Sequence, residues 1–537
     1  MNILGIHGGI TLSQHDAAAA LIVDGSLVCC IEEERLNRVK NPMGVLPVQS
    51  IRACLKEGNL SINDIDLIIT PGETYNDIIP RTKEWITHQF GYSPNIKAMN
   101  HQTAHIASSF FQSGFDEAMC LSYDAWGDGL SGALAIASKK NGIKIIETFP
   151  KNKSLGIFYT TMTSFLGFKP NEDEYKVMGL APYGKPNIDL SFFCKATNTG
   201  NDLDMSYYSQ LRNPYPSQCE SKYSSKLVEK IGNPRLNNSE LTDHYKNLAA
   251  STQFTLEQCV ISNVKYLHTL TNKKNLCLAG GVALNCSANG MISKLPFIEH
   301  LFVQPSSSDR GLALGCALFG AFYENEKIKP IKHVFYGPKI DNKKIESSIK
   351  LTGFKTRYLD DPAKEAAELL AKKKILGWFQ GKSEFGPRAL GHRSILADPG
   401  YPDMKDLINS KVKFREEYRP FAPSVLEEKY KSIFDLNEPS PYMTITCGVK
   451  DEWQSKIPAT VHINNTARVQ TVNDKIDPLY HSLIKSLENL NGRPVVLNTS
   501  FNIRGQPIVE TPLEAISTFA GSGIDYLIMG NYLLQKK

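Results

Sequence analysis

The sequence predicts an α/β protein made of two large domains. Short apolar runs of strand length alternate with stretches of helical spacing, which is the pattern of α/β domains. Hydrophobic residues make up 42% of the 537 positions and charged residues 21%, so the chain can bury a sizeable core. A charged stretch with two prolines, residues 324–342, indicates the domain boundary. We therefore expect domains at residues 1–335 and 343–537.

The N-terminal domain opens with predicted strands. Residues 3–6, 17–23 and 27–31 are apolar runs, and the dipeptide Asp24-Gly25 between the last two is a strong hairpin signal. The polar segment 198–238 is rich in Asn, Ser, Tyr and Pro, and we interpret it as loops that help to shape a substrate pocket. Further elements are expected as a helix at residues 46–55 and strands at 65–70, 121–123 and 276–278.

Composition excludes several classes of protein. The 60 basic and 55 acidic residues are too balanced for a protein that coats nucleic acid. The longest apolar run, residues 17–23, is far shorter than the roughly 20 residues that cross a bilayer, and we see no signal peptide. The 11 cysteines are scattered without a CxxC pair, which favours reduced thiols in the cytoplasm. An intracellular enzyme is the best interpretation.

Two histidines four positions apart, His101 and His105, share one face of a helix and can reach one metal ion. Gln102 stands where a zinc protease motif needs its general-base Glu. On spacing alone, ordinary packing is the better explanation. The metal interpretation needs more ligands, and Asp124 and Asp309 at glycine-containing turns are the candidates. Two imidazoles and two carboxylates suit Fe(II), Mn(II) or Zn(II).

Two glycine-rich turns follow apolar strands. Gly127-Asp128-Gly129 is one, and Gly280-Gly281, followed by Asn285, is the other. Such turns can hold phosphate with backbone N–H groups, although a simple tight turn explains each one equally well. Together with Gly8-Gly9, they resemble the layout of an actin-like ATPase.

Basic charge is concentrated in residues 371–420, where 11 Lys or Arg stand against 6 Asp or Glu. A solvated basic face is the simple explanation, but glycine and proline threaded between the charges favour a polyanion site. The segment 497–502 places polar side chains after an apolar run, as either a capped turn or a small polar pocket. A lone histidine, His15, is more often structural than catalytic, yet its place beside the first hairpin makes it a candidate general base.

Ten sequence blocks, in order from near one end of the chain to near the other, resemble the NodU/CmcH family of O-carbamoyltransferases. The blocks are HDAAAALIVDG, EEERLNRVK, HQTAHIASSF, DEYKVMGLAPYG, LAGGVALNC, SSSDRGLALG, GPRALGHRSILADP, KVKFREEYRPFAPSV, TARVQ and LNTSFNIRGQPIVETP. Two departures are Ala17, where many members have Pro, and Glu174-Tyr175, where a Gly-Glu run is more usual.

The resemblance implies an N-terminal actin-like ATPase domain similar to TsaD and a C-terminal domain similar to YrdC. It implies that the second domain makes carbamoyl adenylate from carbamoyl phosphate and ATP, with Mg²⁺, and that the first, with Fe²⁺ or another divalent metal, transfers the carbamoyl group to a hydroxyl. Such an enzyme needs fixed cations against the repulsion between two polyanions and must keep water from the adenylate.

The resemblance also assigns roles by position. It implies that His101, His105, Asp124 and Asp309 hold the metal, and that His15 assists transfer. It places Gly127, Asp128, Gly129, Lys176, Gly280, Gly281 and Asn285 on nucleotide-contacting segments. It places Arg388, Arg393, Lys413, Arg419 and Arg468 at the anion site, with Ser500 in the carbamoyl phosphate pocket. From the basic stretch and the polar segment 497–502 themselves, we also expect Arg415, Asn498 and Thr499 to bind substrate or nucleotide.

The expected partners are carbamoyl phosphate, ATP and a small-molecule hydroxyl acceptor such as a sugar or secondary metabolite, without nucleic acid or membrane. A homodimer is the default oligomer. Two alternatives remain open: a factor of tRNA threonylcarbamoylation, which shares both folds, and an actin-like ATPase that switches partner binding without catalysis.

Overall fold

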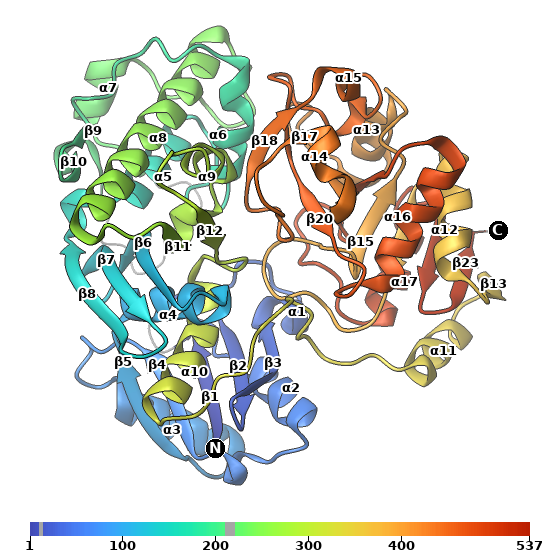
Figure 1. Cartoon of the computed structure of the whole chain (residues 1–537), viewed down its shortest axis with the longest axis horizontal. Coiled ribbons are helices and arrows are strands. Elements are labelled where there is room, and N and C mark those ends of the chain that lie inside the picture. The colour runs from blue at the N-terminus through green and yellow to red at the C-terminus, as the bar shows by residue number, and fades with distance from the viewer. Residues whose placement is uncertain (10–13, 210–220, 537) are drawn as a thin grey trace. The chain divides into compact units, whose positions relative to one another are not determined.

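The computed structural model describes residues 1–9, 14–209 and 221–536. The chain divides into two compact units (Figure 1). The N-terminal unit contains Met1–Val28 and Asn41–Ile331, and the C-terminal unit contains Cys29–Lys40 and Lys332–Lys537. A short segment from near the start of the chain is therefore part of the C-terminal unit. No helix in the described part of the chain has the length and apolarity to cross a membrane.

The first sheet of the N-terminal unit has five strands in the order β3-β2-β1-β4-β5. β1 pairs antiparallel with β2 and parallel with β4, which in turn pairs parallel with β5. Asp24 and Gly25 adopt φ angles of 45° and 71° in the predicted hairpin turn. The strands are β1 (Asn2–His7), β2 (Ala18–Val23), β3 (Ser26–Glu32), β4 (Leu67–Pro71) and β5 (Asn95–Met99), which confirms the strands expected in this region.

The second sheet repeats this plan, in the order β12-β11-β6-β7-β8. β6 pairs antiparallel with β7 and parallel with β11, as β1 does with β2 and β4. The unit therefore contains a structural duplication, although the sequence shows no repeat of fixed period. The strands are β6 (Glu117–Gly127), β7 (Leu130–Ser138), β8 (Gly142–Phe149), β11 (Asn275–Ala279) and β12 (His300–Val303), and they include the predicted strands 121–123 and 276–278.

Helices and a small hairpin complete the N-terminal unit. The predicted helix at 46–55 is present as α2 (Val48–Gly58). The described part of the polar segment 198–238 includes the strand β10 (Gly200–Leu203), which pairs with β9 (Cys194–Thr197), and α7 (Ser225–Ile231); residues 210–220 lie outside the described part. The other helices are α3 (Ile78–Phe90), α4 (His101–Ser113), α5 (Leu155–Phe165), α6 (Glu174–Leu180), α8 (Asp243–Thr271), α9 (Cys286–Ile292) and α10 (Leu312–Tyr323).

α10 packs closely against the backbones of α4 and β1. A Cβ added at Gly315 of α10 would lie 1.9 Å from the carbonyl oxygen of Ala104 in α4. A Cβ added at Gly5 of β1 would lie 2.0 Å from the carbonyl oxygen of Ala313. Glycine at these two positions allows α4, α10 and β1 to approach one another more closely than any side chain would permit.

The C-terminal unit is built on an eight-stranded sheet in the order β13-β23-β22-β14-β15-β21-β16-β20. Alternate side chains of its central strands enter different cores, since Phe379 and Leu497 pack in one cluster and Trp378 and Val496 in the other. Both faces of the sheet are therefore covered. The strands are β13 (Lys355–Tyr358), β14 (Leu376–Phe379), β15 (Arg393–Ala397), β16 (Ala422–Leu426), β20 (Gln470–Val472), β21 (Val495–Ser500), β22 (Tyr526–Met529) and β23 (Tyr532–Gln535).

Helices and a small sheet surround this core. α12 (Pro362–Ala371) and α16 (Pro478–Asn491) supply one cluster, and α13 (Met404–Ile408) and α17 (Pro512–Ala520) supply the other. A separate three-stranded sheet has the order β17-β18-β19. The remaining elements are β17 (Phe434–Asp435), β18 (Thr446–Val449), β19 (Thr466–Arg468), α1 (Glu33–Asn37), α11 (Asn342–Lys350), α14 (Tyr430–Ile433) and α15 (Asp451–Gln454).

We expect Gly315→Ala to destabilise the N-terminal unit by about 1–3 kcal/mol, because the new methyl group would overlap the backbone of α4. Denaturant unfolding of the full chain measures the loss. The control is Gly353→Ala, at a position where an added Cβ meets nothing within 4 Å. Equal stability of the two variants would contradict the close approach of α10 and α4.

Candidate metal centre and anion site

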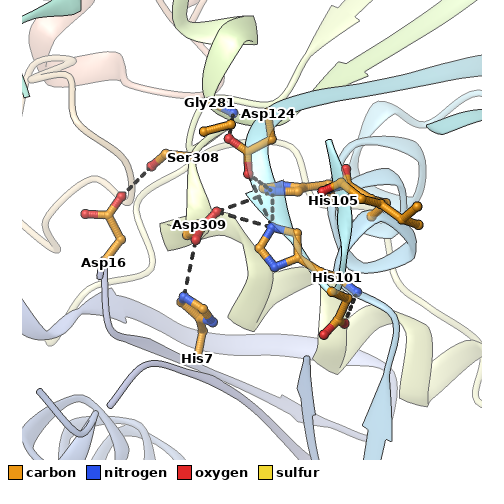
Figure 2. Close-up of polar contacts among 12 residues, drawn as sticks. His7, Asp16, His101, His105, Asp124, Gly281, Ser308 and Asp309 are labelled. Atoms are coloured by element: carbon orange, nitrogen blue, oxygen red, sulfur yellow. Dashed lines mark hydrogen bonds and ion pairs between the residues drawn. The ribbon is translucent and has the colours of Figure 1, made fainter. Parts of the chain in front are cut away.

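Three elements of the N-terminal unit bring together four predicted metal ligands. His101 and His105 lie on the first turns of α4, Asp124 lies near the end of β6, and Asp309 lies just before α10 (Figure 2). All four side chains are buried. One potential ligand atom from each lies within 4.8 Å of the others.

The nitrogen and oxygen atoms of this cluster face one another. The Nε2 atoms of His101 and His105 are 3.1 Å apart. Asp124 Oδ2 lies 3.3 Å from His101 Nε2 and 3.4 Å from His105 Nε2. Asp309 Oδ1 lies 3.5 Å from each of the same two nitrogens. The two histidines, spaced four residues apart on one helix, and the two carboxylates at turns therefore point into one small volume.

The pKa values in this cluster reflect burial and close opposite charges. Burial alone would lower the pKa of His101, but the carboxylates of Asp309 and Asp124 reverse this effect and raise the pKa to about 10. Burial and mutual repulsion oppose ionisation of Asp124, yet the histidines hold the pKa of its carboxyl below the usual range. The carboxylates are therefore poised to be charged, as cation ligands must be.

Local contacts fix the ligands in place. Asn100 caps α4 by accepting hydrogen bonds from the N–H groups of Gln102 and Thr103. Asp128 Oδ2 accepts from the N–H groups of His101 (2.8 Å) and Gly72 (3.2 Å), which ties the start of α4 to the β6–β7 turn. Asp128 and Gly129 have φ angles of 51° and 77°, as a two-residue hairpin turn requires. The carboxylate of Asp128 thus has a structural task.

Two glycines make room for the cluster. A Cβ at Gly127 would lie 2.4 Å from the imidazole ring of His101. The N–H group of Gly281 donates to Asp124 Oδ1 over 3.2 Å, and a Cβ there would lie 2.9 Å from the same oxygen. These predicted nucleotide-contacting glycines therefore also shape the metal-ligand cluster.

Two further residues near the cluster were missed at the sequence level. His7 Nε2 lies 3.7 Å from Asp309 Oδ2, and burial lowers the pKa of His7 to about 4 despite that carboxylate. Asp16 pairs with His15 Nδ1 at 3.5 Å and with Arg310 at 3.0 Å, and it accepts a hydrogen bond from Ser308 (2.9 Å). His15 is 42% exposed, and Asp16 orients its ring. Burial alone would lower the pKa of His15, but the Asp16 carboxylate reverses this effect and raises the pKa to about 10, which favours the protonated ring at neutral pH.

The donor chemistry fits a divalent cation. Two imidazole nitrogens and two carboxylates form a mixed set of the kind that binds Fe²⁺, Mn²⁺ or Zn²⁺. His105 Nδ1 is buried and has no hydrogen-bond partner among the described residues, so the contacts of this ring in the described chain are made through Nε2, which faces the cluster.

The other predicted nucleotide residues lie in separate local structures. Gly280 has a φ of 90°, and a Cβ there would lie 2.2 Å from the carbonyl oxygen of Tyr123, so the turn requires glycine. Asn285 caps α9 and exchanges hydrogen bonds with Gln253. Lys176 pairs with Asp173 at 3.0 Å. The structure thus gives several of these residues local partners.

In the C-terminal unit, Lys413 forms the centre of a second cluster. Its ammonium group contacts Ser500 Oγ (3.2 Å), the carbonyl oxygen of Ser500 (2.5 Å), and Asn502 through Oδ1 (2.8 Å) and the carbonyl oxygen (3.0 Å). The residue lies in a π-helical turn, Asn409–Lys413, and is buried. The structure therefore joins Lys413 to the segment 497–502, and Asn502 is a contact that the sequence did not single out.

The surroundings of Lys413 are strongly positive. Burial, followed by the charges of Arg415, Arg419 and Lys40, lowers the pKa of Lys413 well below its ordinary value. Arg415 itself donates to Asn409 Oδ1 (3.2 Å) and to the carbonyl oxygen of Pro420 (3.1 Å). Arg419 lies 3.5 Å from Glu416. Lys413, which contacts Ser500, is thus under the influence of two further predicted cations, Arg415 and Arg419.

Arg393 and Asn498 are placed differently. The guanidinium of Arg393 is fully buried, stacks 3.8 Å from the Phe379 ring and donates to the carbonyl oxygens of Gln380, Gly381 and His392. Asn498 is buried and donates to the carbonyl oxygen of Ala389. Most polar atoms of both side chains thus contact the protein itself, while Arg393 Nε and Asn498 Oδ1 are buried without a hydrogen-bond partner among the described residues. Arg388, Arg468 and Thr499 are partly buried.

A buried acidic group lies beside Arg393. Glu510 Oε1 is 3.8 Å from Arg393 Nη2, and the side chain is only 2% exposed. Burial raises the pKa of Glu510 to about 7, although the charges of Arg393 and Arg35 oppose this shift. The carboxyl group therefore changes its charge near neutral pH.

Comparison with protein families accounts for most of the chain. The family model described as "Carbamoyltransferase N-terminus" matches residues 3–85 and 86–318, and "Carbamoyltransferase C-terminus" matches residues 367–536. An uncharacterized protein of Synechocystis sp. is 35% identical over 98% of this chain and 96% of its own length. Nodulation protein NolNO of Sinorhizobium fredii is also 35% identical, over 100% of this chain and 83% of its own length. Among solved structures, HypF of T. kodakarensis is similar over 60% of this chain and 48% of its own, with 14% identity and a TM-score of 0.38.

We expect the purified chain to bind about one Fe²⁺, Mn²⁺ or Zn²⁺ per molecule, and His105→Ala to weaken that binding by at least about tenfold, because a ligand is lost. Metal analysis after equilibrium dialysis gives the measurement. The control is His481→Ala, since His481 pairs with Glu428 in the C-terminal unit. Equal metal content in the two variants would rule out the cluster as the binding site.

We expect Glu510 to make the chain less stable as pH rises from about 5 to 7. The ordinary pKa of glutamate is 4.5 and that of buried Glu510 is about 7, so between these values the folded state keeps a proton that the unfolded state has lost. The free energy of unfolding of Glu510→Gln should therefore increase relative to wild type across this range. Urea titrations at several pH values test this, with the exposed Glu452→Gln as control. A difference independent of pH would contradict the prediction.

Proposed function

This chain belongs to the carbamoyltransferase family, and we propose that it is an ATP-dependent O-carbamoyltransferase with two sites. In the C-terminal unit, carbamoyl phosphate, ATP and water would give carbamoyl adenylate, phosphate and pyrophosphate, with Mg²⁺ on the nucleotide. In the N-terminal unit, a hydroxyl oxygen of the acceptor would bond to the carbamoyl carbon, and AMP would leave. The N-terminal unit would then be a TsaD-like, actin-like ATPase domain, and the C-terminal unit a YrdC-like domain.

The observation that carries the proposal is the positive charge around Lys413. The four contacts of its ammonium group are with uncharged oxygens, while burial, and after it the charges of Arg415 and Arg419, lower the pKa of Lys413. A buried cation among other cations is costly unless an anion joins it. Two phosphate-bearing substrates would supply such anions, and fixed cations would offset the repulsion between them. Ser500 Oγ donates to Asn502 Oδ1 over 2.7 Å, and in the proposed complex its hydroxyl would turn to donate to a phosphate or carbamoyl oxygen.

The N-terminal unit would complete the reaction. His101, His105, Asp124 and Asp309 would hold a divalent metal, Fe²⁺ in our proposal, which as a Lewis acid would polarise an oxygen of the carbamoyl or phosphate group. The neutral form of His15, with Asp16 at Nδ1, would accept the proton of the attacking hydroxyl at Nε2. The turns at Gly127–Gly129 and Gly280–Gly281 would lie along the nucleotide. The acceptor would be a small molecule with a hydroxyl group, and the enzyme would work in the cytoplasm, with a homodimer as the default state.

We expect Arg419→Ala to abolish pyrophosphate release from ATP and carbamoyl phosphate, because a cation that balances the two polyanions is removed. His15→Ala should spare this step and slow transfer by about 10²–10⁴-fold, the usual contribution of a general base. A pyrophosphate assay and mass spectrometry of acceptor mixtures, searching for a gain of one carbamoyl group, measure the two steps.

Three outcomes would argue against the proposal. A wild-type chain without pyrophosphate release would remove the transferase and favour an ATPase switch. Carbamoylation of tRNA rather than of a small molecule would favour the threonylcarbamoylation alternative. Equal loss of pyrophosphate release in the two variants would contradict the division of labour between the units.

A further inference from the structure

The segment 32–38 belongs to the C-terminal unit although it precedes most of the N-terminal unit in the chain. It covers the end of β3 and the short helix α1. Glu32 and Arg35 are each 2% exposed, and Arg38 has a left-handed backbone with φ of 63°. We call this segment the N-terminal clamp and describe its two sets of contacts in turn.

Glu32 and Arg35 hold the loop that carries Arg388. Glu32 Oε1 accepts a hydrogen bond from the N–H group of Gly386 over 2.5 Å. Arg35 Nη2 donates to the carbonyl oxygens of Glu384 (3.1 Å) and Gly386 (2.8 Å). Backbone N–H and C=O groups of the loop are therefore both bound by buried, charged side chains. Hydrogen bonds to charged groups are stronger than those between neutral groups.

Arg38 holds the loop that contacts Lys413. Arg38 Nη1 and Nη2 donate to the carbonyl oxygens of Ile508 (2.6 Å) and Pro507 (2.9 Å), and Nη1 lies 3.3 Å from Glu514 Oε2. The same loop closes on itself, because Asn502 Nδ2 donates to the carbonyl oxygen of Gln506 over 2.6 Å.

These contacts connect Arg38 to Lys413 through the loop that contains Asn502. Asn502 accepts from the Lys413 ammonium group at Oδ1 and donates to Gln506 at Nδ2, and Arg38 holds the residues that follow Gln506. The guanidinium of Arg38 is planar and binds two adjacent carbonyl groups, so it fixes both the position and the direction of the loop. Two residues after the segment, Lys40 acts on Lys413 through its charge.

We propose that the N-terminal clamp positions the two loops of the C-terminal anion site, and that Arg38 is a positioning residue for Lys413. This inference rests on the proposed function of the site as an anion-binding site. In this arrangement Arg38 touches no substrate. It acts by keeping Asn502 and Ser500 where they hold the ammonium group of Lys413 in one place.

The test uses the full chain and inorganic phosphate as the probe. Arg38→Gln should weaken phosphate binding, measured by titration calorimetry, by about tenfold, because the loop that holds Lys413 loses its charged hydrogen-bonding partner. Arg38→Lys keeps the positive charge but loses the paired N–H donors. Its phosphate affinity should lie between those of the wild type and Arg38→Gln. The matched control is Arg357→Gln, because Arg357 is an exposed arginine of the same unit that pairs with Glu365.

A second set of readouts separates positioning from general damage. The metal content and the melting temperature of Arg38→Gln should stay at wild-type values, while the pH dependence of phosphate binding shifts because Lys413 is held differently. Unchanged phosphate affinity in a folded Arg38→Gln chain would overturn the proposal. Loss of metal content or melting temperature in parallel with phosphate affinity, in both Arg38 variants, would also overturn it in favour of a structural role.

The binding measurement needs no turnover, so it is independent of the proposed reaction. A wild-type chain that binds phosphate but releases no pyrophosphate would contradict the proposed function, and the clamp would still be tested by the variants. A wild-type chain without affinity for phosphate would overturn the anion site and the clamp together.

Discussion

The N-terminal unit is organised by the need to bring two carboxylates and two imidazoles within 4.8 Å of one another in a buried volume. The ligands come from α4, from the end of β6 and from the start of α10, so these elements must meet at their ends. Gly127 and Gly315 permit that approach because glycine has no side chain, and Asp128 holds the start of α4 by accepting a hydrogen bond from the N–H group of His101. Much of the local geometry follows from this convergence of charge.

The C-terminal unit faces the opposite electrostatic problem. Its buried Lys413 lies among cations and is held by neutral oxygens, whereas the acidic oxygens of the N-terminal cluster are held by imidazoles. One centre thus favours an anion and the other a cation. A chain with both kinds of centre is suited to chemistry in which a phosphate-bearing intermediate is made at one and consumed at the other, as we propose for this member of the carbamoyltransferase family.

Much of the fold could be predicted from local sequence, because apolar runs and the Asp24-Gly25 turn act over a few residues. The grouping of His101, His105, Asp124 and Asp309 followed from helical spacing and turn residues together with the resemblance. The duplicated sheet was not predicted, because strand order depends on long-range pairing. The burial of Arg393 and the contacts of Asn502 were not predicted either. The order of residues in a basic or polar stretch does not indicate which of its side chains will form hydrogen bonds with other groups of the protein.

The C-terminal unit is built from two parts of the chain that are far apart in sequence, so its parts are synthesised at different times. Arg38 and its partner Ile508 are separated by 470 residues. A ribosome that adds about 5–20 residues per second needs roughly half a minute to a minute and a half to cover that distance. Throughout this time Arg38 has been synthesised, but its partners Pro507, Ile508 and Glu514 have not. The last step of folding would then be the capture of an early segment by the newest part of the chain.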